Sequence, residues 1–526
     1  MNSRLTQTTL LHLAQLGVRE VCVAAGARNT PLITALLAST GVKLWNFFDE
    51  RSAGFFALGR MMADRRPVAV LTTSGTAVAE LLPAVIEAYY QALPLVLVTA
   101  DRPSRFRGSG APQAIEQPGI FSAYAERTID LEDGGPEVNW PKALGRKPVH
   151  INVCLDEPLA GESDGIDFAV WDDLAPHHRP DLSPDGAMLD LLCEFVTKRE
   201  DLLVLAGGLH PLEAAMIAPA LRHLGAPIVA EATSNLHEHP ALNPLFVPGG
   251  EAALRALGPK RVLRVGAVPS WRWWRDLEDA KGAHLVHLSR APFAGLSRWG
   301  GVAVQPLSLL AQAAARIVPT VMDPASSAAS LHDGLEAVLA AHPLSEAAWM
   351  RHLSLIIPEG ARVFLGNSLP VREWNLAAAP ASLGTTFYAN RGANGIDGLV
   401  STFLGVSSSI DEAWLVVGDL SALYDLSAPW LLSQLEAGNR RIVIINNGGG
   451  KIFSRVASLK SLDEPSRSLI ENRHNIDFEP WAKLWNMHYQ RVTVPADLQS
   501  LPDGAMMIEV RPDAGQTSAF WEQWQG

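Results

Sequence analysis

Short apolar runs rich in Val, Ile and Leu recur along the whole chain, and they constrain the fold more than any other feature. They do not alternate between apolar and polar residues, which is typical of strands covered on both faces. Longer helical patterns separate them, and strands that alternate with helices form parallel sheets in an α/β fold. The sequence therefore predicts strands at 21–26, 68–73, 94–100, 150–153, 202–208, 227–232, 261–266, 284–288, 362–367, 414–419, 441–447 and 506–510.

Two stretches, 161–186 and 318–330, divide these runs into three groups of similar size. The first is rich in Asp, Pro, Gly and His and the second in Ala, Ser and Pro, as linkers are. A chain of 526 residues is long enough for about three domains, each with its own core. We therefore expect three doubly wound parallel-sheet domains, over 1–165, 185–320 and 331–526, which could be three copies of one architecture.

Charge and cysteine content exclude several classes of function. The formal net charge is −12 and no long basic run occurs, which argues against nucleic acid or an anionic membrane as the main partner. The three cysteines lie far apart without a CxxC pair, so neither a zinc knuckle nor a disulfide framework is expected. No apolar stretch is long enough to span a membrane, and the N-terminus has the pattern of an amphipathic helix rather than a signal peptide. We expect a cytoplasmic protein.

Two familiar nucleotide-binding fingerprints are absent from the sequence. No GxGxxG follows any predicted strand, so the sequence lacks the fingerprint of a dinucleotide-binding fold. The GGGK at 448–451 lacks the upstream Gly of a P-loop, and Ile452 stands where Ser or Thr would meet magnesium. Both of these nucleotide-binding interpretations are therefore weak.

The strongest candidate site follows two neighbouring strands in the last third of the chain. One strand ends in Gly418 and Asp419 and the next in Asn446 and Asn447, with room for one helix between them. Parallel strands end at the same edge of a sheet, where ligands bind in open α/β folds. Carboxylate and carboxamide oxygens suit Mg²⁺ or Ca²⁺, and the glycines at 448–450 allow close approach to phosphates.

This pattern, Gly-Asp followed by Asn-Asn, resembles the signature of the thiamine-diphosphate enzymes. The motifs GDLSALYDL, NNGGGKIF and NRGANGIDGLVST more closely resemble the 2-succinyl-5-enolpyruvyl-6-hydroxy-3-cyclohexene-1-carboxylate synthases of menaquinone biosynthesis. The motifs AAGARNTPL, FFDERSAGFFALG, TTSGTAVAELLPAV and TADRP agree with that resemblance. They lie in the first and last thirds of the chain, and the middle third carries none that we can name.

The resemblance implies a fold, an assembly and a reaction. It implies a pyrimidine-binding domain, a central domain and a diphosphate-binding domain, with the active site shared between two subunits of a homodimer or homotetramer. The reaction implied is decarboxylation of 2-oxoglutarate and 1,4-addition of the succinyl carbanion equivalent to isochorismate, giving CO₂ and the product for which the family is named. The pathway is menaquinone or phylloquinone synthesis. The cofactors implied are thiamine diphosphate and Mg²⁺, with Mn²⁺ as a substitute.

The resemblance also implies the residues that hold the cofactor. Glu50 matches the acid that bonds to the pyrimidine N1′, which requires a carboxyl with a raised pKa in an apolar setting. Ile396 matches the residue that props the cofactor in its bent shape. The metal ligands implied are Asp419, Asn447 and the Gly449 carbonyl, with Asn446 and Gly448 as the alternative register. Gly418 and Ser421 of the same motif are expected to contact the cofactor.

Both implied substrates are dicarboxylates, so the resemblance implies an arginine-lined pocket, because the guanidinium fork binds a carboxylate through two hydrogen bonds. Arg28 and Arg391 are expected to take part in catalysis as well as binding. The expected substrate-binding residues are Arg28, Arg102, Gln113, Ser368, Arg372, Asn390 and Arg391. The sequence departs from the family pattern at Ala27, Pro112 and Asn394, which affects fine substrate contacts rather than the cofactor site.

Two other functions fit the same cofactor motifs. One is a different thiamine-diphosphate 2-oxoacid decarboxylase or carboligase that uses other substrates. The other is a non-catalytic protein that binds the cofactor as a sensor. Glu50 argues against a sensor, because binding the diphosphate does not require an acid at the pyrimidine.

Overall fold

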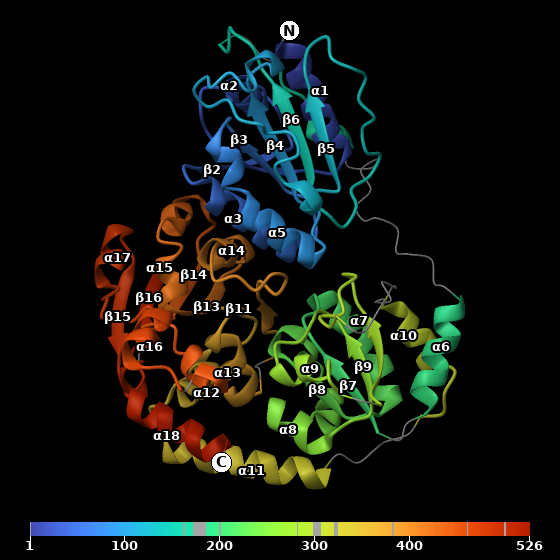
Figure 1. The fold of residues 1–526 in the computed structure, drawn as a ribbon, viewed down its shortest axis with the longest axis vertical. Coiled ribbons are helices and arrows are strands. Elements are labelled where there is room, and N and C mark those ends of the chain that lie inside the picture. The colour runs from blue at the N-terminus through green and yellow to red at the C-terminus, as the bar shows by residue number, and fades with distance from the viewer. Residues whose placement is uncertain are drawn as a thin grey trace. The chain divides into compact units, whose positions relative to one another are not determined.

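The computed structural model describes residues 2–160, 164–171, 186–198, 201–280, 282–297, 307–319, 325–380, 383–459, 461–498 and 501–525. Every strand pairing in these residues that the structure gives is parallel, and the strands form three sheets. A helix lies between most successive strands, so the predicted α/β class with three parallel-sheet domains is confirmed (Figure 1).

The first sheet has the strand order β2-β1-β3-β4-β6-β5. Its strands are β1 (Glu20–Ala24), β2 (Lys43–Phe47), β3 (Ala69–Thr72), β4 (Val96–Asp101), β5 (Arg127–Leu131) and β6 (Val149–Cys154). The helices of this part are α1 (Asn2–Gln15), α2 (Thr30–Leu37), α3 (Glu50–Asp64), α4 (Thr76–Ala79) and α5 (Leu82–Gln91). The expected amphipathic helix at the N-terminus is α1, which buries Leu10 and Leu13 in the core of this sheet.

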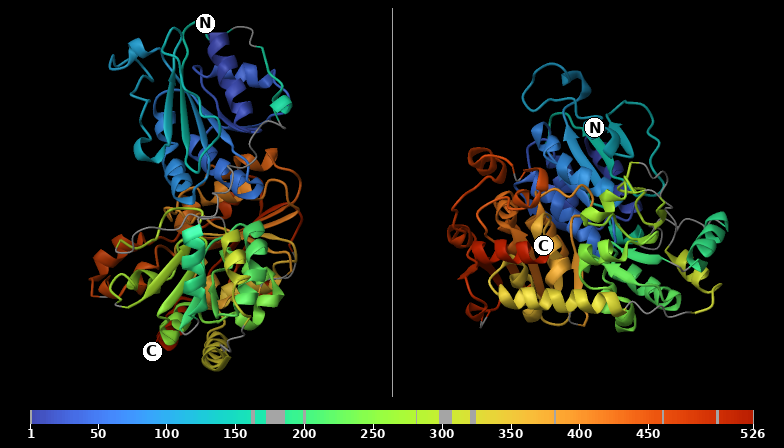
Figure 2. Two further views of the ribbon diagram at one scale, coloured as in Figure 1. Left: turned by 90° about the vertical axis from the view of Figure 1, so that its right-hand side faces the viewer. Right: turned by 60° about the horizontal axis from the view of Figure 1, so that its bottom comes forward.

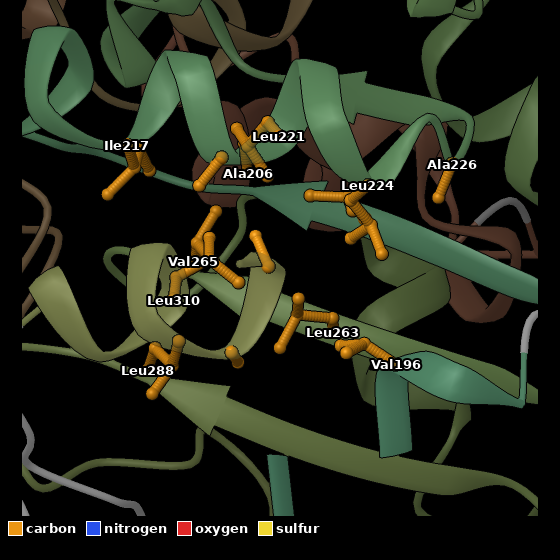
Figure 3. Close-up of a cluster of buried hydrophobic side chains, with 14 of the residues drawn as sticks. Val196, Ala206, Ile217, Leu221, Leu224, Ala226, Leu263, Val265, Leu288 and Leu310 are labelled. Atoms are coloured by element: carbon orange, nitrogen blue, oxygen red, sulfur yellow. The ribbon is translucent and has the colours of Figure 1, made fainter. Parts of the chain in front are cut away.

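The second sheet is smaller, with the order β10-β9-β7-β8. Its strands are β7 (Leu202–Ala206), β8 (Ile228–Ala230), β9 (Arg261–Val265) and β10 (His284–Leu288). The helices are α6 (Gly186–Thr197), α7 (Pro211–Leu224), α8 (Gly250–Leu257), α9 (Arg272–Asp276) and α10 (Ser308–Ala314). Figure 3 shows how Leu221 of α7, Val265 of β9 and Leu310 of α10 meet in one buried apolar cluster.

The third sheet has the order β12-β11-β13-β14-β16-β15. Its strands are β11 (Arg362–Leu365), β12 (Thr386–Tyr388), β13 (Glu412–Gly418), β14 (Asn439–Ile445), β15 (His488–Val492) and β16 (Ala505–Val510). The helices in this stretch of the chain are α11 (Ala325–Ala341), α12 (Glu346–Ile356), α13 (Leu369–Ala377), α14 (Leu399–Val406), α15 (Asp419–Leu423), α16 (Glu464–Glu471), α17 (Glu479–Leu484) and α18 (Ala514–Gln525). Helices α11 and α18 lie side by side in Figures 1 and 2.

The three sheets share one topology. If the strands of each sheet are counted from its own first strand, both six-stranded sheets read 2-1-3-4-6-5 and the middle sheet reads 2-1-3-4. The idea that the chain contains three copies of one architecture is therefore confirmed at the level of strand order. In each copy the direction of winding reverses between the first and third strands, where α/β sheets of this kind bind ligands beyond the strand ends.

Close contacts divide the chain differently from the sheets, into two compact units. The first unit contains Met1–Pro180, Gly392–Ser409 and Tyr424–Glu436, and the second contains Asp181–Arg391, Ile410–Leu423 and Ala437–Gly526. Helix α14 therefore belongs with the N-terminal sheet, where it packs on α3. The predicted domain boundaries stay a prediction.

The two predicted linkers fall largely on residues outside the described ranges. Of the first, residues 164–171 and Gly186, the first residue of α6, are described, and Phe168 is fully buried in the core of the first sheet. Of the second, residues 325–330 form the start of α11, so the linker prediction is wrong there. The composition is ambiguous in this segment, because Ala has the highest helix propensity of any residue.

Candidate functional site

The two strand ends singled out in the sequence lie next to each other in the third sheet. Strands β13 and β14 pair in parallel, and Gly418 lies opposite Ile445. Asp419 and Asn446, which come next in the chain, therefore leave the sheet at the same edge. A Cβ atom built on Gly418 would meet no atom within 4 Å, so this strand end has open space beside it.

Asp419 is buried and faces the glycine turn that follows β14. Its Oδ2 accepts hydrogen bonds from the backbone amides of Gly448 and Gly449, both at 2.9 Å. The turn needs glycine, because Gly448 and Gly449 have φ of 80° and 133°. The Nε2 of His474 lies 3.3 Å from the same oxygen. Burial raises the pKa of the Asp419 carboxyl, although the hydrogen bond from the Gly449 amide lowers it in part.

The structure distinguishes the two asparagines that the sequence leaves as alternative metal ligands. Asn446 donates through Nδ2 to the Ile476 carbonyl and the Glu509 carboxylate, so its amide group is used in hydrogen bonds within the third domain's own structure. Asn447 donates through Nδ2 to Glu346 Oε1 at 3.1 Å. Its Oδ1 is buried and has no hydrogen-bond partner among the residues that the structure describes. This geometry favours Asn447.

These donors fit a hard divalent cation. A carboxylate from Asp419 and a buried amide oxygen from Asn447 are ligands of the kind that Mg²⁺ takes, with phosphate oxygens and water completing the coordination. The described residues contain no cluster of three or more His, Cys, Asp or Glu side chains able to hold a metal. A metal bound here would therefore depend on the amide, on backbone carbonyls and on the cofactor's own oxygens.

Two buried glutamates beside Asn447 were not predicted from the sequence. Glu346 begins α12 and Glu373 lies on α13, and both side chains are almost completely buried. Arg455 Nη2 lies 2.6 Å from Glu373 Oε1 and 3.7 Å from Glu346 Oε2. Burial, and then the charge of Glu373, raises the pKa of Glu346 to about 8. Glu346 and Asn447 also line a cavity of about 900 Å³ within the second unit.

Glu50 lies in the first unit, at the first position of α3. Asp49 caps this helix by accepting a hydrogen bond from the Ser52 amide. Glu50 is half-buried, and burial followed by the charges of Asp49 and Glu80 raises its pKa. Of the four flanking phenylalanines, Phe47, Phe55 and Phe56 are buried, whereas Phe48 is 57% exposed.

The four predicted arginines fall into two pairs, one in each unit. In the first unit the pKa of Arg28 is lowered, mainly by burial and next by the charge of Arg102. In the second unit the pKa of Arg372 is lowered, mainly by burial and next by the charge of Arg391. Two neighbouring guanidinium groups that are partly buried repel each other, and a bound dianion would relieve that repulsion.

Hydrogen bonds to backbone carbonyls hold the first arginine pair, and a side-chain hydrogen bond holds Arg391 of the second. Arg28 Nη1 donates to the Leu155 carbonyl at 2.9 Å, and Arg102 Nε donates to the Pro112 carbonyl at 2.9 Å. Arg391 Nη1 donates to Asn367 Oδ1 at 2.9 Å, and Asn367 in turn donates to the Asn390 carbonyl at 2.8 Å.

The other predicted substrate residues lie at irregular turns. Gln113 is exposed and has φ of 57°, and Ser368 precedes α13 with φ of 72°. Both conformations are uncommon for residues other than glycine and are found at functional sites. Gln113 lies against Gly75, which has φ of 84°. A Cβ atom built on Gly75 would lie 3.1 Å from the Cα atom of Gln113, so there is little room for a side chain at Gly75.

The remaining predicted cofactor residues lie on the segments that flank α14 and form α15. Ile396 is half-buried in the first unit, just before α14. The loop before it is anchored by Glu87, whose two carboxylate oxygens accept hydrogen bonds from the amides of Gly392 and Ala393, each at 2.7 Å. Ser421 is buried on α15, in the second unit.

Comparison with known families and proteins gives consistent results. Residues 4–120 match the family model described as "Thiamine pyrophosphate enzyme, N-terminal TPP binding domain". A 2-succinyl-5-enolpyruvyl-6-hydroxy-3-cyclohexene-1-carboxylate synthase of Bdellovibrio bacteriovorus is 39% identical, covering 99% of this chain and 98% of its own. The protein of the same name from Akkermansia muciniphila is 42% identical, covering 95% of this chain and 94% of its own.

A solved structure is similar in fold over almost the whole chain. It is the thiamine diphosphate-dependent 4-hydroxybenzoylformate decarboxylase of Rhodococcus jostii, with a TM-score of 0.73 and 18% sequence identity. The match covers 97% of this chain and 99% of that one. Among the described residues, no helix has the length and apolarity that crossing a membrane requires.

Proposed function

The chain belongs to the 2-succinyl-5-enolpyruvyl-6-hydroxy-3-cyclohexene-1-carboxylate synthase family, and from this premise we propose a role for each part of the candidate site. The activity is a transferase reaction that joins 2-oxoglutarate, with loss of CO₂, to isochorismate in menaquinone synthesis. The observation that carries the cofactor assignment is the turn at Gly448 and Gly449, whose amides bond to Asp419 beside an unpartnered Asn447 oxygen.

Thiamine diphosphate, when bound, supplies a carbon nucleophile and then accepts the electron pair that decarboxylation releases. Asp419, Asn447 and the Gly449 carbonyl would hold Mg²⁺, or Mn²⁺ in its place, against the diphosphate. Gly418 leaves the space that a bound group needs, and Ser421 lies one turn further on. Ile396 would support the bent shape of the cofactor.

Glu50 holds a proton at the far end of the cofactor in this proposal. Its raised pKa keeps the carboxyl protonated closer to neutral pH than an exposed glutamate, so it can donate to the pyrimidine N1′. The buried rings of Phe47, Phe55 and Phe56 belong to the same helix and strand and keep water from this part of the fold.

The arginine pairs bind the substrate carboxylates. Arg28 with Arg102, and Arg372 with Arg391, each present two cations at a strand end, and Gln113, Ser368 and Asn390 add polar contacts. Arg28 and Arg391 would also stabilise the negative charge that develops during the reaction, because fixed positive charge lowers the barrier. The complete site requires at least a homodimer, because Glu50 of one subunit serves the cofactor held by another.

The direct test is an assay of the purified protein with thiamine diphosphate, Mg²⁺, 2-oxoglutarate and isochorismate, followed by mass spectrometry of the products. We expect isochorismate to disappear only when the cofactor and 2-oxoglutarate are both present, with formation of the family product. Replacing 2-oxoglutarate by pyruvate is the matched control and should give no product. Release of CO₂ from 2-oxoglutarate without loss of isochorismate would instead indicate a different acceptor.

A further inference from the structure

We propose that Glu346 is a positioning residue that sets the rotation of the Asn447 amide and so directs its oxygen toward the metal. The inference rests on the proposed role of Asn447 as a metal ligand. It adds a residue that lies about a hundred positions away in sequence and on a different element, α12. No motif of the sequence marks Glu346.

The position of Glu346 is fixed by its helix. It is the first residue of α12, and Ser345 caps that helix by accepting a hydrogen bond from the Ala348 amide. The Glu346 backbone amide donates to Thr517 Oγ1 at 3.1 Å. The side chain is 4% exposed and points to Asn447, with 3.1 Å between Oε1 and Nδ2. Glu346 Oε1 therefore faces the amide of Asn447.

Hydrogen-bond chemistry then decides which way the amide faces. Glu346 Oε1 accepts whether the group is ionised or carries its proton on Oε2, the oxygen that lies toward Arg455 and the neighbouring Glu373. A carboxamide, in contrast, has a donor end and an acceptor end. Turning the Asn447 amide by half a revolution would bring its oxygen against Glu346 Oε1, with no proton between them. The acid therefore selects the rotamer in which Nδ2 faces Glu346 and Oδ1 faces the opposite side, where it is buried without a partner among the described residues.

Arg455 and Glu373 hold Glu346 from the other side. Arg455 contacts both carboxylates and stacks on Trp521, with 4.3 Å between the guanidinium carbon and the ring centroid. Arg455 follows the glycine turn in the chain, so the segment that carries Asn447 is tied to α12 at two points. Residues that hold a metal ligand by its second polar atom commonly change metal affinity tenfold or more when they are replaced.

The test measures Mn²⁺ binding to the full-length protein saturated with thiamine diphosphate, from the electron paramagnetic resonance signal of free Mn²⁺. Glu346→Gln keeps the size of the side chain but offers both a donor and an acceptor, so either amide rotamer becomes acceptable. We expect its Kd for Mn²⁺ to rise about tenfold. Glu522→Gln is the matched control, because Glu522 is exposed in the same cavity, and it should bind Mn²⁺ as the wild type does.

A double-mutant cycle separates positioning from a general loss of structure. In an Asn447→Ala background, Glu346→Gln should cause no further loss of Mn²⁺ affinity, because there is no amide left to orient. An equal tenfold loss in both backgrounds would overturn the inference. Should Glu346→Gln fail to fold, Glu346→Asp withdraws the accepting oxygen from the Asn447 amide by one methylene, and unchanged Mn²⁺ affinity in that variant would overturn the inference as well.

Two further variants distinguish this inference from the metal site on which it rests. If Asp419→Asn and Asn447→Ala bind Mn²⁺ as tightly as the wild type, the proposed metal site is wrong and the inference falls with it. If both weaken binding while Glu346→Gln does not, the metal site stands and the positioning role is wrong.

Discussion

Glu50 illustrates how a side chain acquires a chemical role from its surroundings. It begins a helix, where a negative charge is favoured by the helix dipole, and yet burial and two neighbouring acids raise its pKa. These influences oppose each other, and the raised pKa shows that desolvation prevails. A carboxyl in such a position keeps its proton to higher pH than an exposed glutamate does, which is the direction that the proposed chemistry requires.

Replacement of Glu50 tests this role without disturbing the fold. Glu50→Gln should slow exchange of the cofactor C2 proton at least a hundredfold, because the amide cannot transfer a proton at the pyrimidine. The exchange is measured by NMR of thiamine diphosphate bound to the protein in deuterated buffer. Glu80→Gln removes a nearby acid that is exposed, and should exchange at nearly the wild-type rate. Equal rates for both variants and the wild type would remove Glu50 from the mechanism.

His150 makes the stability of the first unit depend on pH. It is fully buried on β6, where its Nε2 lies 2.7 Å from Thr99 Oγ1, and burial lowers its pKa to about 4. The ordinary pKa is about 6.5, so between these values only the unfolded chain takes up the proton. Stability is therefore complete above about pH 6.5 and falls as the pH drops toward 4, by up to about 3 kcal/mol.

The measurement is a series of urea unfolding curves from pH 7.5 to 4.5. The wild-type midpoint should fall over this range, and His150→Gln, which can still bond to Thr99, should show a smaller slope. A His150 ring signal that titrates near pH 6.5 in the folded protein would contradict this prediction.

The residues of the candidate site differ in how far the sequence could predict them. Asp419 and Asn447 could be placed together because each follows a strand, and parallel strands end at one edge. Glu346 could not, because an acid in the first turn of a helix is usually explained by the dipole alone. Glu373 lies in the middle of α13 and belongs to no motif. The contact of Glu346 with Asn447, and the closeness of Glu373 to Glu346, depend on how α12 and α13 pack, which leaves no local pattern.

At the level of elements, the structure contains every strand that the sequence predicts. It also contains four strands that the sequence does not predict, and these share one property. They are β2, β5, β12 and β15, the two edge strands of each six-stranded sheet. An inner strand such as β4 is buried at every residue, whereas β15 buries only its last one. Edge strands therefore lack the continuous apolar run that predicts a strand covered on both faces.

The packing of α3 on α14 gives a prediction at the same level. A Cβ atom at Gly59 would lie 2.0 Å from the Thr402 carbonyl oxygen and 2.8 Å from the Val406 amide nitrogen. Gly59→Ala should therefore force the helices apart and lower the free energy of unfolding by about 3 kcal/mol, despite the better helix propensity of Ala.

Urea unfolding followed by circular dichroism measures that loss. Gly334→Ala is the matched control, because Gly334 lies within α11 and its Cβ would meet no atom within 4 Å. It should leave stability unchanged or raise it slightly. A Gly59→Ala variant as stable as the wild type would show that α3 and α14 can separate without cost.

At the level of the whole molecule, the proposed assembly predicts complementation between inactive variants. Glu50→Gln and Asp419→Asn should each be inactive alone. If each site takes Glu50 from one subunit and Asp419 from another, a co-expressed mixture forms mixed dimers with one intact site. We expect about a quarter of the wild-type activity for random pairing. A mixture that stays inactive, although mixed dimers are isolated by differently tagged subunits, would place both residues of each site in one chain.

The composition of the first compact unit has a consequence for synthesis of the chain. Helix α3 emerges from the ribosome early, yet α14 and Tyr424–Glu436, which belong to the same unit, emerge more than three hundred residues later. Domains usually fold as they are made, N-terminal part first. Here the face of α3 around Gly59 stays without its partner α14 while the middle sheet is translated. Slow translation between residues 180 and 392 therefore prolongs the time in which a chaperone, or a second nascent chain, can bind that face.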